Sequence, residues 1–262
     1  MSQKKVSTTI KDCKFAGESH LGLIRSNNED SFLYSARPGD VNFLVVVADG
    51  IGGLDNGEVA SWMCCSHLLK AWNKKNIAHE TSEKKLCNFL YREISHINRE
   101  IYRVNKKEHK AESMGTTVVA AIICPEIIIV IHAGDSRLYR VRNGHLNPMT
   151  EDHSFVNALV KKEIIDFDAA NAFPFSHVIM KSLGPMEEVE ADINIFTREP
   201  GDRFMLCSDG LTNHLADYKI ESIIKKSKTP DEAIDKLMRG ALIKGGSDNI
   251  TIICCFPKDI QC

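Results

Sequence analysis

The sequence predicts an α+β fold in which antiparallel β-sheets are covered by helices. Its predicted elements run in the order strands, two adjacent long helices, several consecutive strands, and then a mixture of both. A parallel doubly wound sheet would show strands and helices in alternation, so the order argues against that class. The chain of 262 residues contains no repeat, low-complexity run or linker rich in Pro, Gly and Ser. We therefore expect one domain over residues 1–262, with its core at about 15–256 and short tails outside it.

The predicted strands are short and rich in β-branched residues. They cover residues 43–48, 116–124, 127–132, 137–142, 202–207 and 250–256. The first is apolar at every position, which is typical of a strand buried on both faces. The second and third form an apolar stretch that is broken at Pro125-Glu126, and this break predicts a turn between two buried strands. The fourth runs into Asn143-Gly144, the strongest short-range hairpin signal in the chain.

Three helices follow from apolar spacing and capping residues. The first is predicted over residues 57–74, with a helically spaced apolar set of Val59, Trp62, Met63, Leu69 and Trp72. The second is predicted over residues 83–104, where steps of three and four residues join Leu86, Leu90, Ile94, Ile97, Ile101 and Val104. A later helix begins at Thr229-Pro230, which suits an N-cap followed by proline, and ends near Gly245-Gly246.

The charge balance and the cysteines exclude several classes of protein. Lys and Arg total 33 against 35 Asp and Glu, so the net charge of −2 argues against a nucleic-acid binder that works by bulk charge. The polar N-terminus contains no signal peptide, and the longest apolar stretch, residues 118–131, is too short to span a bilayer. Nine cysteines without a Cys-x-x-Cys pair indicate reduced, buried thiols rather than disulfides or a zinc site. We therefore expect a cytoplasmic protein that binds neither nucleic acid nor membrane.

Acidic residues recur at the ends of the predicted strands. Asp49-Gly50 and Asp209-Gly210 each follow a buried strand, Asp248 precedes another, and Asp135 lies in a turn between two more. Rigid strand ends can hold carboxylates around a hard divalent cation such as Mg²⁺ or Mn²⁺, which prefers oxygen ligands. Each Asp-Gly pair can also be an ordinary turn dipeptide, so spacing alone leaves both readings open.

A second polar cluster lies between Gly22 and Asp30. Arg25 precedes the adjacent acids Glu29 and Asp30, and an arginine can bind a phosphate group through two parallel hydrogen bonds. Taken alone, the same residues also fit a solvated polar loop.

Together these segments resemble the metal-dependent protein serine/threonine phosphatase family (type 2C, PPM), in its compact bacterial form. The similarity covers about Phe15 to Phe256 and rests on six segments in the family's order: Gly22-x-x-Arg25-x-x-Asn28-Glu29-Asp30, Val47-Ala48-Asp49-Gly50-Ile51-Gly52-Gly53, Met114-Gly115-Thr116-Thr117, His132-Ala133-Gly134-Asp135-Ser136-Arg137, Leu206-Cys207-Ser208-Asp209-Gly210-Leu211-Thr212 and Ser247-Asp248-Asn249-Ile250-Thr251. Any one of these segments is a weak signal, whereas six in order are a strong one.

The resemblance implies two packed antiparallel sheets flanked by helices, a four-layer α-β-β-α sandwich, with a metal centre at one edge. It implies two Mg²⁺ or Mn²⁺ ions and allows a third. Asp49 would bridge the two ions, Asp209 and Asp248 would hold the first, and the Gly50 carbonyl would hold the second. Glu29 and Asp30 would contact waters of the second ion. Asp135, with Asp209, would match the acids of the third site, Arg25 would bind phosphate, and Asn249 would support the loop.

The resemblance also implies the activity, which is hydrolysis of phosphoserine and phosphothreonine by a hydroxide that bridges the two metals. No cysteine is followed six residues later by arginine, which disfavours a cysteine nucleophile, and a kinase is disfavoured because its motifs are missing. Ile51 stands where many eukaryotic relatives have a histidine that serves as general acid. A flap at about residues 153–180 would lie beside the site, and Ala172-Phe173-Pro174-Phe175 would be loose. Expected partners are phosphorylated proteins, including a cognate kinase or its substrates, and the expected state is a monomer. A catalytically inactive relative and a phosphohydrolase of small metabolites remain alternatives.

Overall fold

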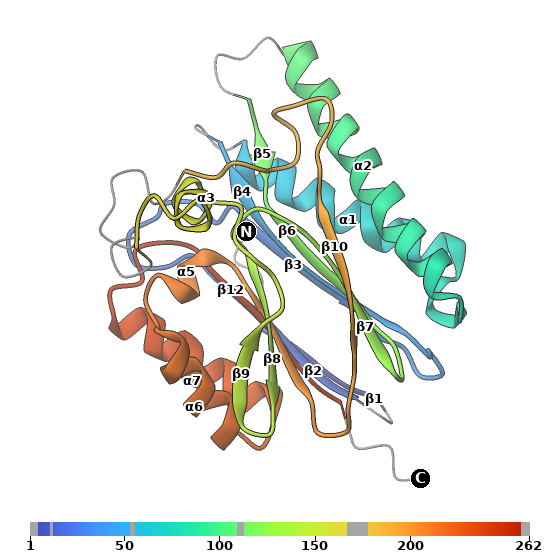
Figure 1. Cartoon of the computed structure of the whole chain (residues 1–262), viewed down its shortest axis with the longest axis vertical. Coiled ribbons are helices and arrows are strands. Elements are labelled where there is room, and N and C mark those ends of the chain that lie inside the picture. The colour runs from blue at the N-terminus through green and yellow to red at the C-terminus, as the bar shows by residue number, and fades with distance from the viewer. Residues whose placement is uncertain (1–4, 11–12, 53–55, 109–112, 167–177, 258–262) are drawn as a thin grey trace.

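The computed structural model describes residues 5–10, 13–52, 56–108, 113–166 and 178–257. Two antiparallel sheets lie face to face and form the centre of the molecule (Figure 1). The first sheet has the order β1 (Val6–Ile10), β2 (Cys13–His20), β12 (Ile250–Pro257), β11 (Arg203–Cys207), β8 (Arg137–Arg142) and β9 (His145–Pro148). The second has the order β10 (Asp192–Thr197), β7 (Ile127–Ala133), β6 (Val118–Ile123), β4 (Phe43–Ile51) and β3 (Asp30–Ser35), and β5 (Gly115–Thr116) pairs with the end of β4.

Helices cover the outer face of each sheet. The long helices α1 (Gly57–Lys75) and α2 (Glu83–Glu108), joined through the short 3-10 turn η1 (Ile77–His79), cover the second sheet. The first sheet is covered by α5 (Asp209–Thr212), α6 (Asp217–Lys226) and α7 (Pro230–Ile243). A further helix, α3 (Phe155–Lys161), lies at the end of the sandwich (Figure 1). The predicted four-layer α-β-β-α sandwich is therefore confirmed.

Strand β4 shows why its sequence is apolar throughout. Val45 and Val47 pack between the two sheets, while Leu44, Val46 and Ala48 face α1 and α2. Alternate side chains of a strand point to opposite faces, so a strand covered on both faces needs apolar residues at every position. This strand ends directly at the candidate site.

The stripe predicted for α2 is confirmed, but the apolar set predicted for α1 is only partly buried. Val59 and Trp62 are exposed, Trp62 by 60%, although Trp72 is buried as expected. The buried side of α1 is made mainly of smaller residues, among them Ala60, Cys64, Leu68 and Ala71. Small side chains let the helix pack closely on β3 and β4, whereas ranking residues by hydrophobicity favours the large ones.

Other elements match the predictions closely. Strands β6 and β7 form the expected hairpin around Pro125-Glu126. Asn143 and Gly144 join β8 to β9 with φ of 52° and 78°, as a tight hairpin turn requires. Thr229 caps α7, since its side-chain oxygen accepts a hydrogen bond from the Glu232 N–H at 3.2 Å.

The N-terminal boundary of the core is a correction. Residues ahead of Phe15 were expected to form a tail, but Val6–Ile10 forms β1 and pairs with β2. Strands β2, β3, β9 and β10 were also not predicted; β10 is an edge strand whose residues are all exposed or half-buried. The loose segment Ala172–Phe175, most of the flap beyond α3, and Gly53 lie outside the described residues.

The cysteines behave as expected. Every cysteine in the described residues is a free thiol, and all of them except Cys87 are buried. Cys207 lies fully buried in β11, as a strand residue should. Among the helices that the structure describes, none combines the length and apolar character needed to cross a bilayer.

Candidate metal centre

Asp30 and Asp49 face each other across neighbouring strands. The register of β3 and β4 places them directly opposite, at one end of the second sheet. The Asp49 backbone is fixed by Thr117, whose side-chain oxygen accepts from the Asp49 N–H at 3.0 Å and whose N–H donates to the Asp49 carbonyl at 2.8 Å. Asp49 therefore lies inside β4, which continues to Ile51, and does not follow the strand as predicted. Asp30 is the first residue of β3 and is buried, rather than part of a solvated loop.

Asp209 and Asp248 are brought together by a close backbone approach. A Cβ atom on Gly210 would lie only 1.9 Å from the carbonyl oxygen of Asn249, so only glycine fits at that position. Asp209 begins α5, separated from β11 by Ser208 alone, and its carboxylate accepts a hydrogen bond from Asn213 at 3.0 Å. Asp248 precedes β12, as predicted.

The loop that carries Arg25 packs against the Asp248 turn. Gly22 has a φ of +83°, and a Cβ there would lie 2.2 Å from the Asp248 carbonyl oxygen. The Arg25 guanidinium donates to the Asp248 carboxylate at 2.8 Å, and its side chain is half exposed. The hydrogen bond to Asp248 raises the pKa of Arg25, and Glu29 and Asp49 add to the shift. The candidate phosphate-binding cation therefore lies at the edge of the acidic cluster.

Asn249 supports the same loop, as expected. Its amide donates to the carbonyls of Leu21 and Asn27, both at 2.9 Å, and its oxygen accepts from the Glu29 N–H at 2.8 Å. Because all of these bonds are used within the protein, Asn249 acts as a brace between the Arg25 loop and β12.

Gly50 lies where three backbone segments meet. Its N–H donates to the Glu29 carbonyl at 3.1 Å, and that carbonyl also accepts from the Ser61 hydroxyl at 2.5 Å. A Cβ on Gly50 would lie 2.3 Å from the Gly57 carbonyl oxygen. The start of α1 thereby holds Gly50 and Glu29 beside Asp49.

Asp135 occupies the turn between β7 and β8, as predicted. One of its carboxylate oxygens is buried without a hydrogen-bond partner in the described structure. Thr117, which fixes Asp49, also shares a hydrogen bond of 2.8 Å with the hydroxyl of Ser136. Asp135 is therefore held close to the same strand ends as Asp49.

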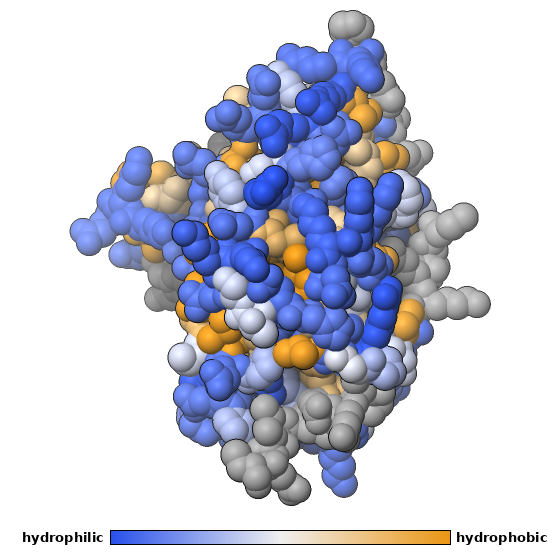
Figure 2. All heavy atoms as spheres, turned by 90° about the vertical axis from the view of Figure 1, so that its right-hand side faces the viewer, coloured by the Kyte–Doolittle hydropathy of each residue, from blue (hydrophilic) through white to orange (hydrophobic). Residues whose placement is uncertain are grey.

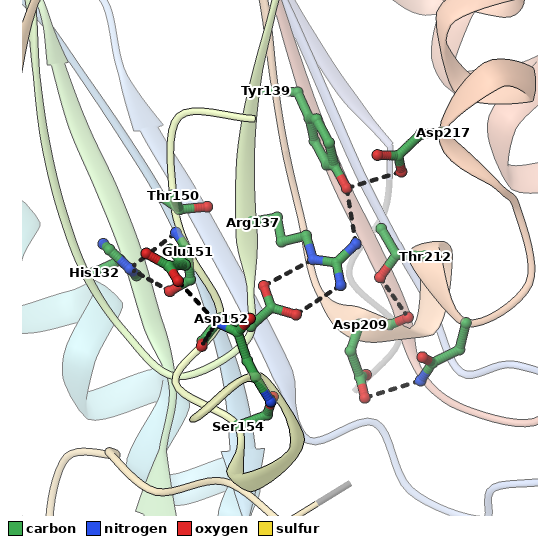
Figure 3. A network of polar contacts seen from close by, with 12 residues as sticks. His132, Arg137, Tyr139, Thr150, Glu151, Asp152, Ser154, Asp209, Thr212 and Asp217 are labelled. Atoms are coloured by element: carbon green, nitrogen blue, oxygen red, sulfur yellow. Dashed lines mark hydrogen bonds and ion pairs between the residues drawn. The ribbon is translucent and has the colours of Figure 1, made fainter. Parts of the chain in front are cut away.

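A network around Arg137 links this turn to the beginning of the flap (Figure 3). Arg137 makes a bidentate pair with Asp152 at 2.8 and 2.6 Å and donates to the Tyr139 hydroxyl at 2.9 Å. The Tyr139 hydroxyl in turn donates to Asp217 at 3.1 Å. The sequence reasoning missed this network, although Arg137 lies in one of the segments that it singled out.

The electrostatics identify one acidic cluster. Burial raises the pKa values of Asp30, Asp49 and Asp135 well above the usual range of an aspartate. Neighbouring carboxylates raise them further: Asp49 is affected by Asp30, Asp209, Asp135 and Asp248. Like charges brought this close repel one another unless protons or cations neutralise them.

The donor set fits hard divalent cations. It consists of aspartate oxygens and backbone carbonyls, and buried carboxylate oxygens of Asp30 and Asp135 have no hydrogen-bond partner in the described structure. Oxygen-only sets of this kind suit Mg²⁺ or Mn²⁺ better than the softer metals that select sulfur or imidazole ligands. The fit follows from the residues themselves.

A family model described as protein phosphatase 2C matches residues 16–238. The chain belongs to the protein phosphatase 2C family. The serine/threonine phosphatase Stp of Listeria monocytogenes is 36% identical over 232 residues, which cover 88% of this chain and 91% of that relative. This membership confirms the resemblance inferred from the six motifs.

Solved phosphatase 2C structures share the fold. The Mycobacterium tuberculosis serine/threonine phosphatase PstP/Ppp superposes with a TM-score of 0.83 at 32% identity, covering 94% of this chain and 99% of that one. The catalytic domain of PstP in complex with two manganese ions gives a TM-score of 0.80 at 32% identity, covering 95% and 99% of the two chains.

Proposed function

We propose that this phosphatase 2C chain hydrolyses phosphoserine and phosphothreonine in proteins, using two Mg²⁺ or Mn²⁺ ions. The observation that carries the proposal is the meeting of five aspartates from five separate segments at one end of the sandwich. They are Asp30, Asp49, Asp135, Asp209 and Asp248. A related catalytic domain with two manganese ions supports the choice of metal.

Each acid has a proposed part in holding the ions. Asp49, Asp209 and Asp248 would hold the first ion, and Asp49 with the Gly50 carbonyl would hold the second. Glu29 and Asp30 would contact water at the second ion, and Asp135 with Asp209 would provide a weaker third site. When bound, the ions supply a hydroxide nucleophile at neutral pH and offset the charge of the phosphoryl group.

Arg25 is proposed to orient the phosphate group. Its guanidinium already lies 2.8 Å from Asp248, and its half-exposed side chain is free to turn outward. The guanidinium could pair with two phosphate oxygens in place of that carboxylate, since its planar donors match a phosphate group bidentately. Ile51 has no proton to give, so the leaving group would take its proton from a metal-bound water, from solvent or from another group.

A groove of about 500 Å³ beside the site offers room for a polypeptide. Its lining includes Ile51, Met180 and Met186, and both methionines are mostly exposed. Flexible, polarizable methionines adapt to varied partner surfaces. The groove therefore supports a phosphoprotein as the substrate in preference to a small metabolite.

The test is hydrolysis of a phosphothreonine peptide with Mn²⁺ and with EDTA, in parallel with Asp209→Ala. Activity should require Mn²⁺ and be lost in Asp209→Ala, while Asp235→Ala, an exposed aspartate on α7, should match the wild type. Activity that survives EDTA, or activity of Asp209→Ala that equals that of the wild type, would rule out the metal mechanism. A strong preference for small phosphate esters over the peptide would favour the metabolite alternative.

The same proposal extends to the organisation of the protein. We propose one catalytic domain, monomeric, acting in a bacterial cytoplasm on phosphoproteins that include a cognate serine/threonine kinase or its substrates. The bacterial relatives of similar length support this assignment. Sedimentation at several protein concentrations tests the monomer, and dephosphorylation of an autophosphorylated kinase tests the partner.

A further inference from the structure

His153 connects the Asp135 turn to both ends of the flap. Its backbone N–H donates to the Gly134 carbonyl at 2.9 Å, and its carbonyl accepts from the Met180 N–H at 2.7 Å. Its ring returns to the same turn, since Nδ1 accepts from the Gly134 N–H at 3.2 Å. One residue thus contacts Gly134 twice and bridges the segment that enters the flap and the segment that leaves it.

The ring of His153 is held on its other sides as well. It stacks on His132 with centroids 4.6 Å apart and planes 6° apart, and Nε2 lies 3.4 Å from the Asp192 carboxylate. His132 is fixed in turn because its Nε2 lies 2.8 Å from the Glu151 carbonyl (Figure 3). Packing on one face and polar contacts at the edge leave the imidazole little freedom to rotate.

The close grouping of His132, His153 and Asp192 invites a metal interpretation, which the hydrogen bonds oppose. Nδ1 of neutral His153 accepts a hydrogen bond from the Gly134 N–H, so Nε2 carries the ring proton and has no lone pair for a metal. The three residues therefore support the turn structurally and do not form a second metal site.

We propose that His153 is a positioning residue that sets the place of the Asp135 carboxylate through the Gly134 N–H. The proposal rests on the metal role proposed for Asp135 above. Gly134 has a φ of +115°, and a Cβ there would lie 2.6 Å from Thr117. The backbone of this turn is therefore closely packed and tolerates little displacement. Losing the acceptor frees the Gly134 N–H and lets Asp135 move relative to Asp49 and the flap.

Two matched variants separate this role from simple packing. In His153→Asn the amide oxygen takes the place of Nδ1, so the bond from Gly134 is kept and the contact with Asp192 is lost. In His153→Gln the amide group reaches the position of Nε2, so the contact with Asp192 is kept and the bond from Gly134 is lost. Thermal unfolding of both variants shows whether each is folded.

The first readout needs no activity. Amide hydrogen exchange followed by NMR should show the Gly134 N–H protected in the wild type and His153→Asn, and unprotected in His153→Gln. The imidazole nitrogen shifts should identify the Nε2–H tautomer of His153. Equal protection of Gly134 in all three proteins, or the Nδ1–H tautomer, would overturn the proposal.

The second readout is Mn²⁺ affinity, followed through the EPR signal of free Mn²⁺. Residues that orient a metal ligand typically change affinity roughly 10–100-fold, so the weakest binding step should weaken by about 10-fold in His153→Gln and stay unchanged in His153→Asn. Equal weakening in both variants would assign the effect to packing. If Asp135→Asn leaves every binding step unchanged, the metal role of Asp135 fails, whatever the Gly134 exchange shows.

An independent observation concerns a basic groove between α1 and α2. It encloses about 590 Å³, and its walls carry the cations Lys70, Lys74, Lys75, Arg92 and Arg99. Its one acid, Glu93, is 5% exposed and already paired with Lys75. The groove is therefore strongly positive in a chain whose net charge is −2.

We infer that this groove binds an acidic segment of a partner protein. The surface on the α2 side of the molecule is mostly hydrophilic, with hydrophobic atoms confined to small separate areas (Figure 2). Such a surface favours a charged occupant, and the concave shape suits a peptide better than the flat surface of a membrane. Nucleic acid is a poorer match because the rest of the protein repels a long polyanion.

A fluorescent glutamate-rich peptide without phosphate tests this inference by anisotropy. The double charge reversal Lys70→Glu with Arg92→Glu should weaken binding at least about 10-fold, as expected for two contacts of about 0.7 kcal/mol or more each. Lys84→Glu with Lys107→Glu, which alters the exposed surface of α2 outside the groove, should bind like the wild type. Equal losses in the two double variants, no binding by the wild type, or stronger binding to an oligonucleotide or anionic vesicles would overturn the inference.

Discussion

Asp49 is the residue on which the candidate metal centre depends most. Its backbone is fixed by Thr117, and its carboxylate lies within the field of four other aspartates. A buried acid of this kind is stable only if protons or cations compensate the surrounding charge. The position of Asp49 therefore lowers the stability of the metal-free protein, and bound ions offset this loss.

Asp49→Asn should reduce phosphopeptide hydrolysis by more than about 100-fold, since even residues that only orient metal ligands cost roughly 10–100-fold. The amide keeps the shape of the side chain but removes the charge that a bridging ligand needs. Steady-state kinetics over a range of Mn²⁺ concentrations measures the change. A variant restored to full activity by more Mn²⁺ would show that Asp49 only tunes affinity.

Arg25→Ala should raise KM for a phosphopeptide by about 10-fold or more, because a charge-assisted hydrogen bond contributes about 1.5–3 kcal/mol. Arg25→Lys should recover only part of the loss, since lysine cannot form the bidentate contact. The comparison requires both KM and kcat for all three proteins. Values unchanged in Arg25→Ala would remove Arg25 from the site.

At the scale of elements, the site depends on how closely loops can approach one another. The start of α5 touches the beginning of β12 at Gly210 and Asn249, and β4 touches the start of α1 at Gly50 and Gly57. The first contact lies beside the first sheet and fixes Asp209 and Asp248, and the second lies beside the second sheet and fixes the end of β4 that carries Asp49. The glycines are therefore as important to the site as the acids.

Gly210→Ala should destabilise the protein by about 2 kcal/mol or more, because its Cβ would lie 1.9 Å from the backbone oxygen of Asn249. Mn²⁺ binding should weaken in the same variant as Asp209 and Asp248 are pushed apart. Gly240→Ala is the control, since its Cβ would meet only the flexible Leu215 side chain at 3.2 Å and alanine favours the helix. Urea unfolding compares the two; similar stabilities would contradict the close packing at Gly210.

At the scale of the whole molecule, pH and metal act on the same group of carboxylates. Asp30 and Asp135 have pKa values raised to about 7 by burial and by neighbouring acids. Their protons are bound more tightly in the folded protein than in the unfolded chain, where the pKa of aspartate is about 3.9. Stability from these groups is present at low pH and is lost as the pH rises through about 7.

Metal-free protein should therefore melt at a lower temperature at pH 8 than at pH 5.5, and Mn²⁺ should raise the melting temperature at pH 8. Asp49→Asn removes one of the repelling charges, so the pH-dependent loss should be smaller in this variant. Differential scanning calorimetry in EDTA and in Mn²⁺ measures all four conditions for both proteins. A metal-free wild type that loses no more stability than Asp49→Asn over this range would contradict the coupling.

Much of the fold could be predicted because local signals and tertiary structure agree. The buried strands, the stripe of α2 and the Thr229 cap each depend on residues close in sequence. The face of α1 was predicted only in part, because the buried residues depend on how near the helix approaches β4, which favours Ala60 and Cys64 over Trp62. The alternation of apolar and polar residues in β10 is too weak for this strand to be recognised without its partner β7.

The sequence by itself determined the family, the four-layer sandwich and the identity of the metal-binding candidates. Each of the six motifs and each apolar periodicity depends only on residues that are close together in the chain. Only the tertiary structure decided that Asp30 is buried opposite Asp49, that Arg25 pairs with Asp248, and that His153 holds the Asp135 turn. These facts depend on strand register and on backbone contacts between segments as many as 223 residues apart. No local pattern encodes such contacts, since they arise only when the two sheets pack and their ends meet.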